Sequence, residues 1–481
     1  MKNLKRVLLG LVCTSLLAGC SKSDWPGDDP VNDDLKAATA DVIIIPVGQP
    51  SGGDDTEAFK AAFAAAQLAG PGAVVLMEAG EYHLGFLEVY DFVGSFMGAG
   101  MDETIITVMN HMDGQSVLDR NLLVDLIKFV GGDVLMSNFT LQTPEGKLTD
   151  TGLPAGNIKS LVALTTGNPG YEFNNEERSI RAVIDQVRFV GHELEGGPGY
   201  TKGHNCNMGV RAGYDCLSGS DVSRAKIDVK ITNSEFYTFT YALALAGTRN
   251  GRLIIGEKNN GNIFNDNDLS VAVWETRHTE VRIEGNTVNV PAFAYGMDLD
   301  DQAWYGILKK EPESEPTVFN VQNNEFNLAH SEYALYLQNM RHRQYPDEVP
   351  VTFQVKNNLF NMTDGYEWAL LSYYTTGVVI RNNQFRGYGD LGLYLVNYSE
   401  NGLVLGNNFS TATWGTGVAY LTASTRNWTF VGGDLGESII NAGTKNLITG
   451  FNVNQSEVPF GETIVDNMQD IKDVLKSLKG K

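Results

Sequence analysis

Cysteine is scarce in this sequence, which has only four cysteines in 481 residues. Cys13 and Cys20 belong to an apolar segment at the beginning of the chain, so Cys206 and Cys216 are the pair left for the body of the protein. In an oxidising compartment this pair can close a loop as a disulfide, and two free thiols are the alternative that the sequence leaves open. A zinc site is the weakest interpretation, because no histidine stands at the spacing that such a site uses.

Positive charge is also in deficit. Lysine and arginine number 36 against 58 aspartates and glutamates, which sets the formal net charge at −22. Nucleic-acid binding needs a basic footprint, so this class of partner is excluded. The charge also disfavours an anionic polysaccharide, unless a basic patch within a Debye length of about 10 Å overrides it.

Long hydrophobic runs are absent apart from "VLLGLVCTSLLAGC" near the start, which is too short to span a bilayer as a mature helix. Lys2, Lys5 and Arg6 precede this run, as in a secretory signal. Its end, Leu17 to Cys20, resembles the lipobox of bacterial lipoproteins, which implies cleavage before Cys20 and acylation of the Cys20 thiol. A plain secretory signal is the alternative.

The segment that follows, 21–41, is acidic and contains Pro and Gly, which predicts a flexible tether. It resembles the acidic export tags on surface lipoproteins of glycan-foraging bacteria. The resemblance implies export across the inner membrane, a lipid anchor at the outer membrane or cell surface, and neighbouring glycan-uptake proteins as partners.

What the sequence does contain is a repeated phrase, an asparagine pair followed by phenylalanine, as in "VQNNEF", "VKNNLF" and "IRNNQF". The closing position of the phrase is aromatic or aliphatic throughout: Phe236, Phe264, Val288, Phe326, Phe360, Phe385, Phe409 and Leu435. The shorter gaps between these positions cluster near 25 residues, which indicates a solenoid. Asn tolerates the left-handed corner between two strands, and a recurring corner lets the amides bond along the axis. We therefore interpret the phrase as scaffold.

Each repeat contains short β-rich runs and no helical periodicity, which predicts an all-β fold, a right-handed parallel β-helix. In runs such as "YALALAG" and "YALYLQN" the third and fifth residues are expected to face inward. The fourth and sixth residues are expected to face outward, and they include Asp298 and Asp300 in "YGMDLDD". Aligning "SVAVWET" from Ser270 puts Glu275 beside Asp300.

The two ends of the solenoid are expected to be capped. Phe59 and Phe63 are four residues apart in 52–70, which predicts an amphipathic helix, and 462–479 repeats apolar residues at helical spacing. The expected organisation is a signal peptide 1–20, a tether 21–41, an N-terminal cap and first coils 42–110, β-helix repeats 111–455 and a C-terminal capping helix 456–481.

The opening of the body resembles that of pectate-lyase-superfamily proteins over about residues 43–110. A "DDT" helix is followed by a strand pair and then by a "GxGxxxTxI" turn, and the matching residues are Gly72, Val74, Leu76, Gly80, Tyr82, Gly98, Gly100, Thr104 and Ile106. The proline of the family pattern is missing, with Glu78 near its place. The resemblance implies a β-helix, while the superfamily itself spans lyases, hydrolases, epimerases and adhesin-like proteins.

Carboxylates, aromatics and cations gather in the middle repeats, beside two insertions at about 301–317 and 339–350. The candidate catalytic residues are Glu275, Asp298, Asp300 and Arg341. The candidate substrate-binding residues are Arg249, His278, Trp304, Tyr336, Gln338, His342, Tyr373 and Tyr394.

Two chemistries would use these groups. A glycoside hydrolase needs a carboxylic acid and a partner carboxylate, and requires no cofactor. A uronate lyase needs a base together with a cation, either arginine or a Ca²⁺ ion held by Asp298, Asp300 and Asp301. Absent signatures exclude a serine-elbow hydrolase and an HExxH metalloprotease. The expected function is therefore binding and cleavage of a polysaccharide, with a non-catalytic glycan-binding or adhesin-like protein as the alternative.

Overall fold

The fold was analysed in a computed structural model. It describes residues 42–109, 125–145, 158–166, 179–193, 204, 206–213, 226–248, 250–274, 276, 278–300, 317–339, 351–432 and 438–455. Several expectations fall outside these ranges: the signal and tether, the C-terminal helix at 456–481, and the residues Cys216, Arg249, Glu275, Asp301, Trp304, Arg341, His342 and Leu435.

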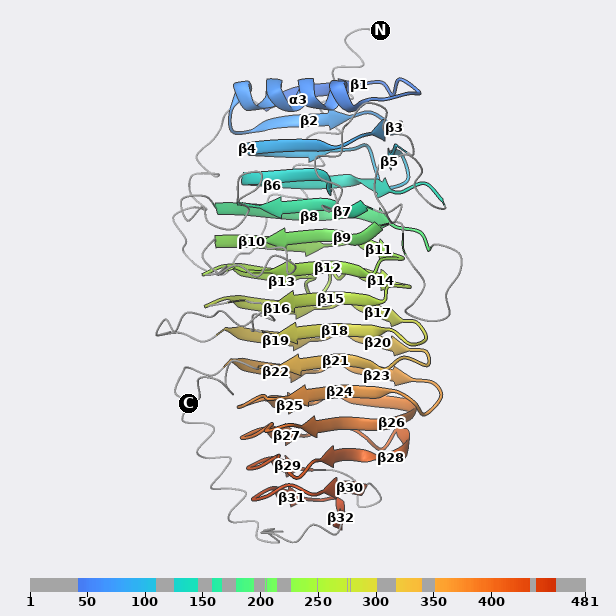
Figure 1. Ribbon diagram of the computed structural model, residues 1–481, viewed down its shortest axis with the longest axis vertical. Coiled ribbons are helices and arrows are strands. Elements are labelled where there is room, and N and C mark those ends of the chain that lie inside the picture. Colours follow the sequence, from blue (N-terminus) through green and yellow to red (C-terminus); the bar gives the residue numbers. More distant parts are fainter. Residues whose placement is uncertain are drawn as a thin grey trace. The chain divides into compact units, whose positions relative to one another are not determined.

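The chain winds as a right-handed parallel β-helix, which confirms the expected fold class (Figure 1). A typical coil has three strands, for example β10 (Lys226–Thr232), β11 (Glu235–Tyr237) and β12 (Tyr241–Ala246). Each strand pairs in parallel with its counterpart one coil away, so the coil rather than the hairpin is the repeating unit. No helix within the described ranges is long and apolar enough to cross a membrane.

The strands stack into three faces. The first face contains β10, β13 (Arg252–Ile255), β16 (Glu280–Glu284), β19 (Val318–Gln322), β22 (Thr352–Lys356), β25 (Val379–Arg381), β27 (Leu403–Leu405), β29 (Thr429–Val431) and β31 (Leu447–Thr449). The second contains β11, β14 (Ile263–Asn265), β17 (Thr287–Val290), β20 (Glu325–Leu328) and β23 (Leu359–Met362). The third contains β12, β15 (Leu269–Trp274), β18 (Tyr295–Asp300), β21 (Tyr333–Gln338), β24 (Trp368–Tyr373), β30 (Ser438–Asn441) and β32 (Asn452–Gln455).

Longer strands complete the stack. β26 (Gln384–Val396) pairs with β23 and then with β24, so it runs through the second and third faces without a break. β28 (Ala412–Leu421) pairs in parallel with β26 one coil further along the axis. The first coils are built by β1 (Ile43–Gly48), β2 (Ala73–Met77), β3 (Gly80–Leu84), β4 (Leu87–Met97), β5 (Thr104–Val108), β6 (Asp125–Gln142), β7 (Ile158–Thr165), β8 (Ser179–Val190) and β9 (Cys206–Gly213).

Helix α3 (Thr56–Ala69) caps the first coil, as expected (Figure 1). Phe59 and Phe63 are buried, and the Phe63 ring meets Phe92 of β4 edge-on at 5.2 Å. The Oγ1 of Thr56 accepts a hydrogen bond from the backbone N–H of Gly85, which ties the start of the helix to the link between β3 and β4. This burial covers the apolar end of the solenoid.

The two asparagines of each repeated pair have different structural roles. The first residue takes the left-handed conformation, with φ of 55° at Asn323, 56° at Asn357 and 55° at Asn382. The second residue is buried, and its Nδ2 donates a hydrogen bond of 2.9–3.0 Å to the Oδ1 of the next coil. This ladder runs through Asn262, Asn286, Asn324, Asn358, Asn383 and Asn407. The prediction of an axial amide ladder is confirmed.

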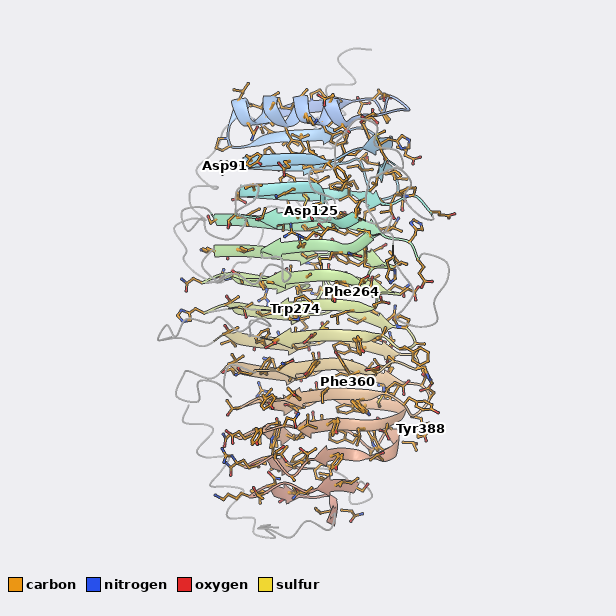
Figure 2. The ribbon with its side chains drawn as sticks, in the orientation of Figure 1. Asp91, Asp125, Phe264, Trp274, Phe360 and Tyr388 are labelled. Carbon is orange, nitrogen blue, oxygen red and sulfur yellow. The ribbon has the colours of Figure 1, made fainter. Side chains whose placement is uncertain are left out.

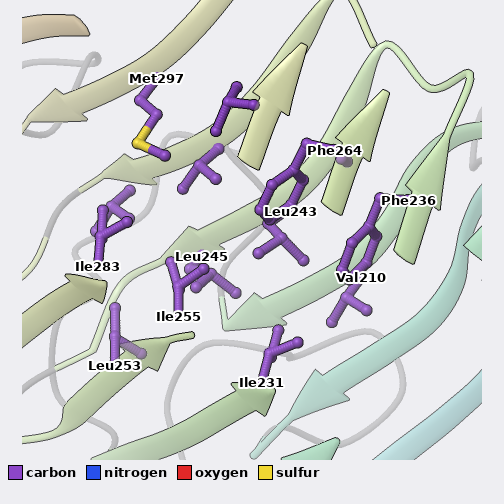
Figure 3. Packing of buried hydrophobic residues seen from close by; sticks show 14 of the residues in the cluster. Val210, Ile231, Phe236, Leu243, Leu245, Leu253, Ile255, Phe264, Ile283 and Met297 are labelled. Atoms are coloured by element: carbon purple, nitrogen blue, oxygen red, sulfur yellow. The ribbon is translucent and has the colours of Figure 1, made fainter. Parts of the chain in front are cut away.

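The phenylalanine that closes the phrase faces the interior, also as predicted (Figure 3). Phe236 and Phe264 stack at 5.0 Å, Phe360 and Phe385 at 5.0 Å, and Phe385 and Phe409 at 4.5 Å. These distances match the spacing of adjacent coils, about 4.8 Å. A ring fills this corner of the core in most coils, and Val288 takes its place between Phe264 and Phe326.

Candidate functional site

The outward side chains of the third face form files along the axis. Asp298 of β18 pairs with Tyr336 of β21, which pairs with Leu371 of β24, and this residue pairs with Tyr394 of β26. All four side chains are partly exposed. The expected inward residues of these strands, including Leu335 and Leu337, are fully buried. The alternation predicted from the sequence is therefore confirmed for these coils.

The expected alignment of β15 was wrong by one residue. Val273 pairs with Leu299 and is fully buried, so Trp274 and not Glu275 stands in line with Asp300. A slip of one residue exchanges the two faces of a strand. Counting from Leu269 puts Val271 and Val273 inward and Trp274 outward, as the structure has them.

Trp274 is thus a site residue that the sequence analysis missed (Figure 2). Its indole Nε1 donates a hydrogen bond of 3.3 Å to Oδ2 of Asp298 on the next coil. The other oxygen, Oδ1, is buried and accepts no hydrogen bond from the part of the chain that the structure describes. A carboxylate that accepts one weak hydrogen bond, and whose other oxygen accepts none, is poorly stabilised as an anion.

Burial therefore raises the pKa of Asp298 to about 7, and the Trp274 hydrogen bond offsets only part of this effect. Two tyrosines share the same surroundings. Burial first, and then the charge of Asp298, raises the pKa of the Tyr333 and Tyr336 phenols, so both remain neutral donors. Asp298 is consequently a carboxyl that exchanges its proton near neutral pH, which is the property of a general acid.

Asp300 lies two residues further along β18, on the same side of the strand as Asp298. The rise of a strand sets their Cα atoms about 6.6 Å apart. Asp300 is only 1% exposed, and its partner in register is the buried Gln338. Asp298 is therefore the more accessible carboxyl of the two, and Asp300 lies deeper.

Beyond Asp298 the face opens into a shallow groove of about 530 Å³. The groove is lined by Tyr336, Leu371, Tyr373, Tyr394, Val396, Asn397, Thr422, Ala423 and Ser424. The structure thus brings together the three tyrosines that the sequence nominated. Their rings stand at angles to each other, with Tyr336 and Tyr373 edge-on at 6.1 Å. A concave, mainly apolar site with a few polar groups at its rim is typical of small-ligand binding.

Other nominated residues lie apart from this groove. His278 stands past the end of β15, in a left-handed corner with φ of 47°. Gln338 is buried in line with Asp300 and does not line the groove. Within the described ranges no three His, Cys, Asp or Glu side chains gather as a metal site, and Asp301, the third expected Ca²⁺ ligand, lies outside them.

Cys206 is a free thiol at the start of β9. It is fully buried, donates to the backbone oxygen of Met208, and has its pKa raised by burial. Cys216 lies outside the described residues, so the pairing of these two cysteines stays a prediction. A thiol in this state is inert, so it belongs to the scaffold.

No protein-family model and no curated protein sequence matches the chain. Solved structures resemble it at low identity. The mannuronan C-5 epimerase AlgE4 A-module of Azotobacter vinelandii is 14% identical over 85% of this chain and 95% of its own, with a TM-score of 0.36. The surface adhesin PfbA of Streptococcus pneumoniae is 14% identical over 79% and 93%, with a TM-score of 0.43.

A third structure is the catalytic unit of a GH87 alpha-1,3-glucanase from Streptomyces thermodiastaticus, which is 13% identical over 86% of this chain and 69% of its own, with a TM-score of 0.40. These likenesses are too distant to assign an activity. The function has to be argued from the groove and its carboxyls.

Proposed function

We propose that this protein binds a polysaccharide along the third face of the β-helix and cleaves it with Asp298 as proton donor. The observation that carries the proposal is the register of β18 and β21. It sets Asp298 directly beside Tyr336, at the end of the tyrosine-lined groove. A reactive carboxyl and a surface for sugar rings are thereby continuous.

The groove suits a neutral sugar chain. Tyrosine rings offer apolar faces to the C–H side of a pyranose, and their hydroxyls offer hydrogen bonds at the edge. The net charge of −22 disfavours an anionic uronate chain, and the fraction of Asp298 that is ionised near neutral pH adds to this effect. A neutral glycan is therefore favoured.

Among the cleavage chemistries, hydrolysis fits Asp298 better than elimination. Protonation of the glycosidic oxygen requires an acid that still holds its proton near neutral pH, and burial beside Trp274 and Tyr336 raises the pKa of Asp298 to about 7. Asp300 is the candidate partner carboxylate. Elimination would need a cation that neutralises the sugar carboxylate, either Arg249 or Arg341 or a Ca²⁺ ion held by Asp298, Asp300 and Asp301, and it stays the alternative chemistry.

The burial of Asp300 favours one alternative, a protein that binds glycan without cutting it. A partner carboxylate must activate water or attack the sugar, and a side chain 1% exposed is poorly placed for either task. For cleavage, binding of the sugar chain over β18 would have to make the Asp300 carboxyl accessible to the sugar or to water. Binding and cleavage therefore have to be measured separately.

The binding half of the proposal predicts that Tyr394→Ala weakens the affinity for a neutral polysaccharide about tenfold, which corresponds to the loss of one aromatic platform. Affinity electrophoresis in starch, dextran, mixed-linkage β-glucan and xylan would identify the glycan, with polygalacturonate as the uronate probe. Release of reducing ends would report cleavage in the same panel.

Tyr237→Ala is the matched control, because Tyr237 is a partly exposed tyrosine on the second face. Unchanged affinity in Tyr394→Ala would refute the groove as the binding site. Binding without any release of reducing ends would decide for the non-catalytic alternative.

The proposal also places the protein at the cell surface, held by a lipid on Cys20. Cys20→Ser is expected to abolish incorporation of labelled palmitate and to shift the protein from the membrane to the soluble fraction, because the acylated thiol is lost. Cys13→Ser, inside the apolar run, is the control and should behave as wild type. An unlabelled wild-type protein would contradict the anchor.

A further inference from the structure

A row of exposed aromatic side chains stands at the corner where the second face turns into the third. Phe293 precedes β18, His330 precedes β21, Tyr366 precedes β24, and Tyr388 lies at the equivalent turn inside β26. We call these four residues the corner ridge. Phe293 is 46% exposed, Tyr366 67% and Tyr388 44%. Figure 2 shows Tyr388 at this edge of the stack.

The ridge is continuous from coil to coil. The ring of Phe293 meets that of His330 at 4.9 Å, and His330 meets Tyr366 at 4.6 Å. The Tyr388 ring covers Gly365, where a Cβ atom would come within 2.6 Å of two ring carbons. Glycine at this point therefore lets the fourth ring pack against the same turn.

The backbone of the ridge is strained at Phe293. In the two preceding coils the left-handed residue of this corner is Thr238 or Asp266, whereas here it is Phe293, with φ of 62°, and His330, with φ of 54°. Phe293 is an outlier in this region, as the β-branched Thr238 is, whereas His is among the residue types enriched there; strain of the kind found at Phe293 clusters at functional sites. The core gains nothing from a ring that is half exposed to water.

Acidic groups accompany the ridge. Asp364 hydrogen-bonds to Nδ1 of His330, and Asp390 accepts from the indole Nε1 of Trp368 at 3.1 Å. Carboxylate oxygens are acceptors for sugar hydroxyls, and they repel a carboxylate ligand. A row of rings at the coil spacing with acceptors beside it matches the alternating apolar faces and hydroxyl edges of a neutral glycan.

From this arrangement we infer that the corner ridge is a second glycan-binding site, which binds a neutral polysaccharide at a distance from the groove. The inference rests on the proposed function, because it assumes that the ligand of the groove is a glycan. The six residues of β24 span about 16 Å, so ridge and groove lie at opposite edges of one face. A short oligosaccharide would occupy only one site, whereas a long chain would reach both and bind more tightly through effective concentration.

The test uses a double variant, Phe293→Asn/Tyr366→Ala, in which Asn is chosen because it tolerates the left-handed conformation. The probes are the polysaccharide that wild type retains in affinity electrophoresis and the tetrasaccharide of the same linkage. The expected result is an affinity for the polymer at least fivefold weaker, with tetrasaccharide affinity within twofold of wild type. Leu68→Ala, an exposed apolar residue on α3, is the control.

The outcomes separate the two proposals. Polymer affinity unchanged in the ridge variant but lowered in Tyr394→Ala would overturn the ridge and leave the groove standing. The reverse pattern would support the ridge and refute the groove. Polymer and tetrasaccharide affinities lowered equally by the ridge variant would also overturn the second site, since they would indicate one common site.

Discussion

Asp298→Asn is expected to lower the rate of glycan cleavage by a factor on the order of 10²–10⁴, because it removes the proton that the leaving oxygen requires. The amide keeps the shape of the carboxyl and can still accept the hydrogen bond from Trp274, so binding should be retained. The measurement is the release of reducing ends by the purified protein, together with affinity electrophoresis of the same samples.

Asp266→Asn is the matched control. Asp266 is an exposed aspartate in a left-handed corner, with φ of 55°, where Asn is equally well tolerated. Equal rates in wild type and Asp298→Asn would remove Asp298 from the mechanism. A parallel loss in the control would attribute the effect to the scaffold.

The pH dependence of stability gives an independent test of the same carboxyl. With a folded pKa of about 7 and an ordinary value near 4 when unfolded, Asp298 holds its proton only in the folded state across this interval. The folded state then binds more protons, so its stability falls as pH rises from about 4 to about 7. Asp298→Asn should remove this contribution, on the order of 1–2 kcal/mol after allowance for its partial exposure.

Urea unfolding of both proteins at the two ends of this interval measures the difference. The variant should gain stability relative to wild type at the upper end and show no advantage at the lower end. An advantage of the same size at both pH values would mean that the pKa of Asp298 is not raised.

Asn358→Ala is expected to have the largest effect on folding, a loss of about 3 kcal/mol or more in the free energy of unfolding. Oδ1 of Asn358 accepts from the backbone and side-chain nitrogens of Asn324, and its Nδ2 donates to Val321 and Asn383. Each buried group left without a partner costs about 1–3 kcal/mol. The measurement is the denaturant midpoint, followed by circular dichroism.

Asn361→Ala supplies the control for this substitution. Asn361 belongs to a second amide ladder on the outer surface, where its Nδ2 donates to Asn327 at 2.7 Å, and it is only partly buried. Water replaces the lost partners there, so the expected loss is below about 1 kcal/mol. Similar losses in both variants would show that the buried ladder has no special role.

Some of the residues proposed to bind glycan could be predicted from the sequence, and others could not. The tyrosines at 336, 373 and 394 could be nominated because period-two alternation assigns their side of the strand. Trp274 was missed because the run was counted from Ser270 and not from Leu269; alternation fits either start, and only the pairing of β15 with β18 decides between them. The corner ridge was missed because its members lie at the corner between two faces, three of them outside any strand, and no periodicity identifies exposure there.

The sequence by itself determined the solenoid. The period near 25 residues, the inward aliphatic positions and the asparagine pairs are local patterns. Each coil repeats the same residue types at its corner and in its interior, so the pattern can be recognised in the sequence. Only the tertiary structure decided the chemistry of the outer surface. Burial between the neighbouring coils raises the pKa of Asp298 and the Trp274 hydrogen bond lowers it, and both effects arise only after the coils have stacked. Residues 24 and 38 positions away in the chain therefore determine its charge, and their distance from it is a property of the fold.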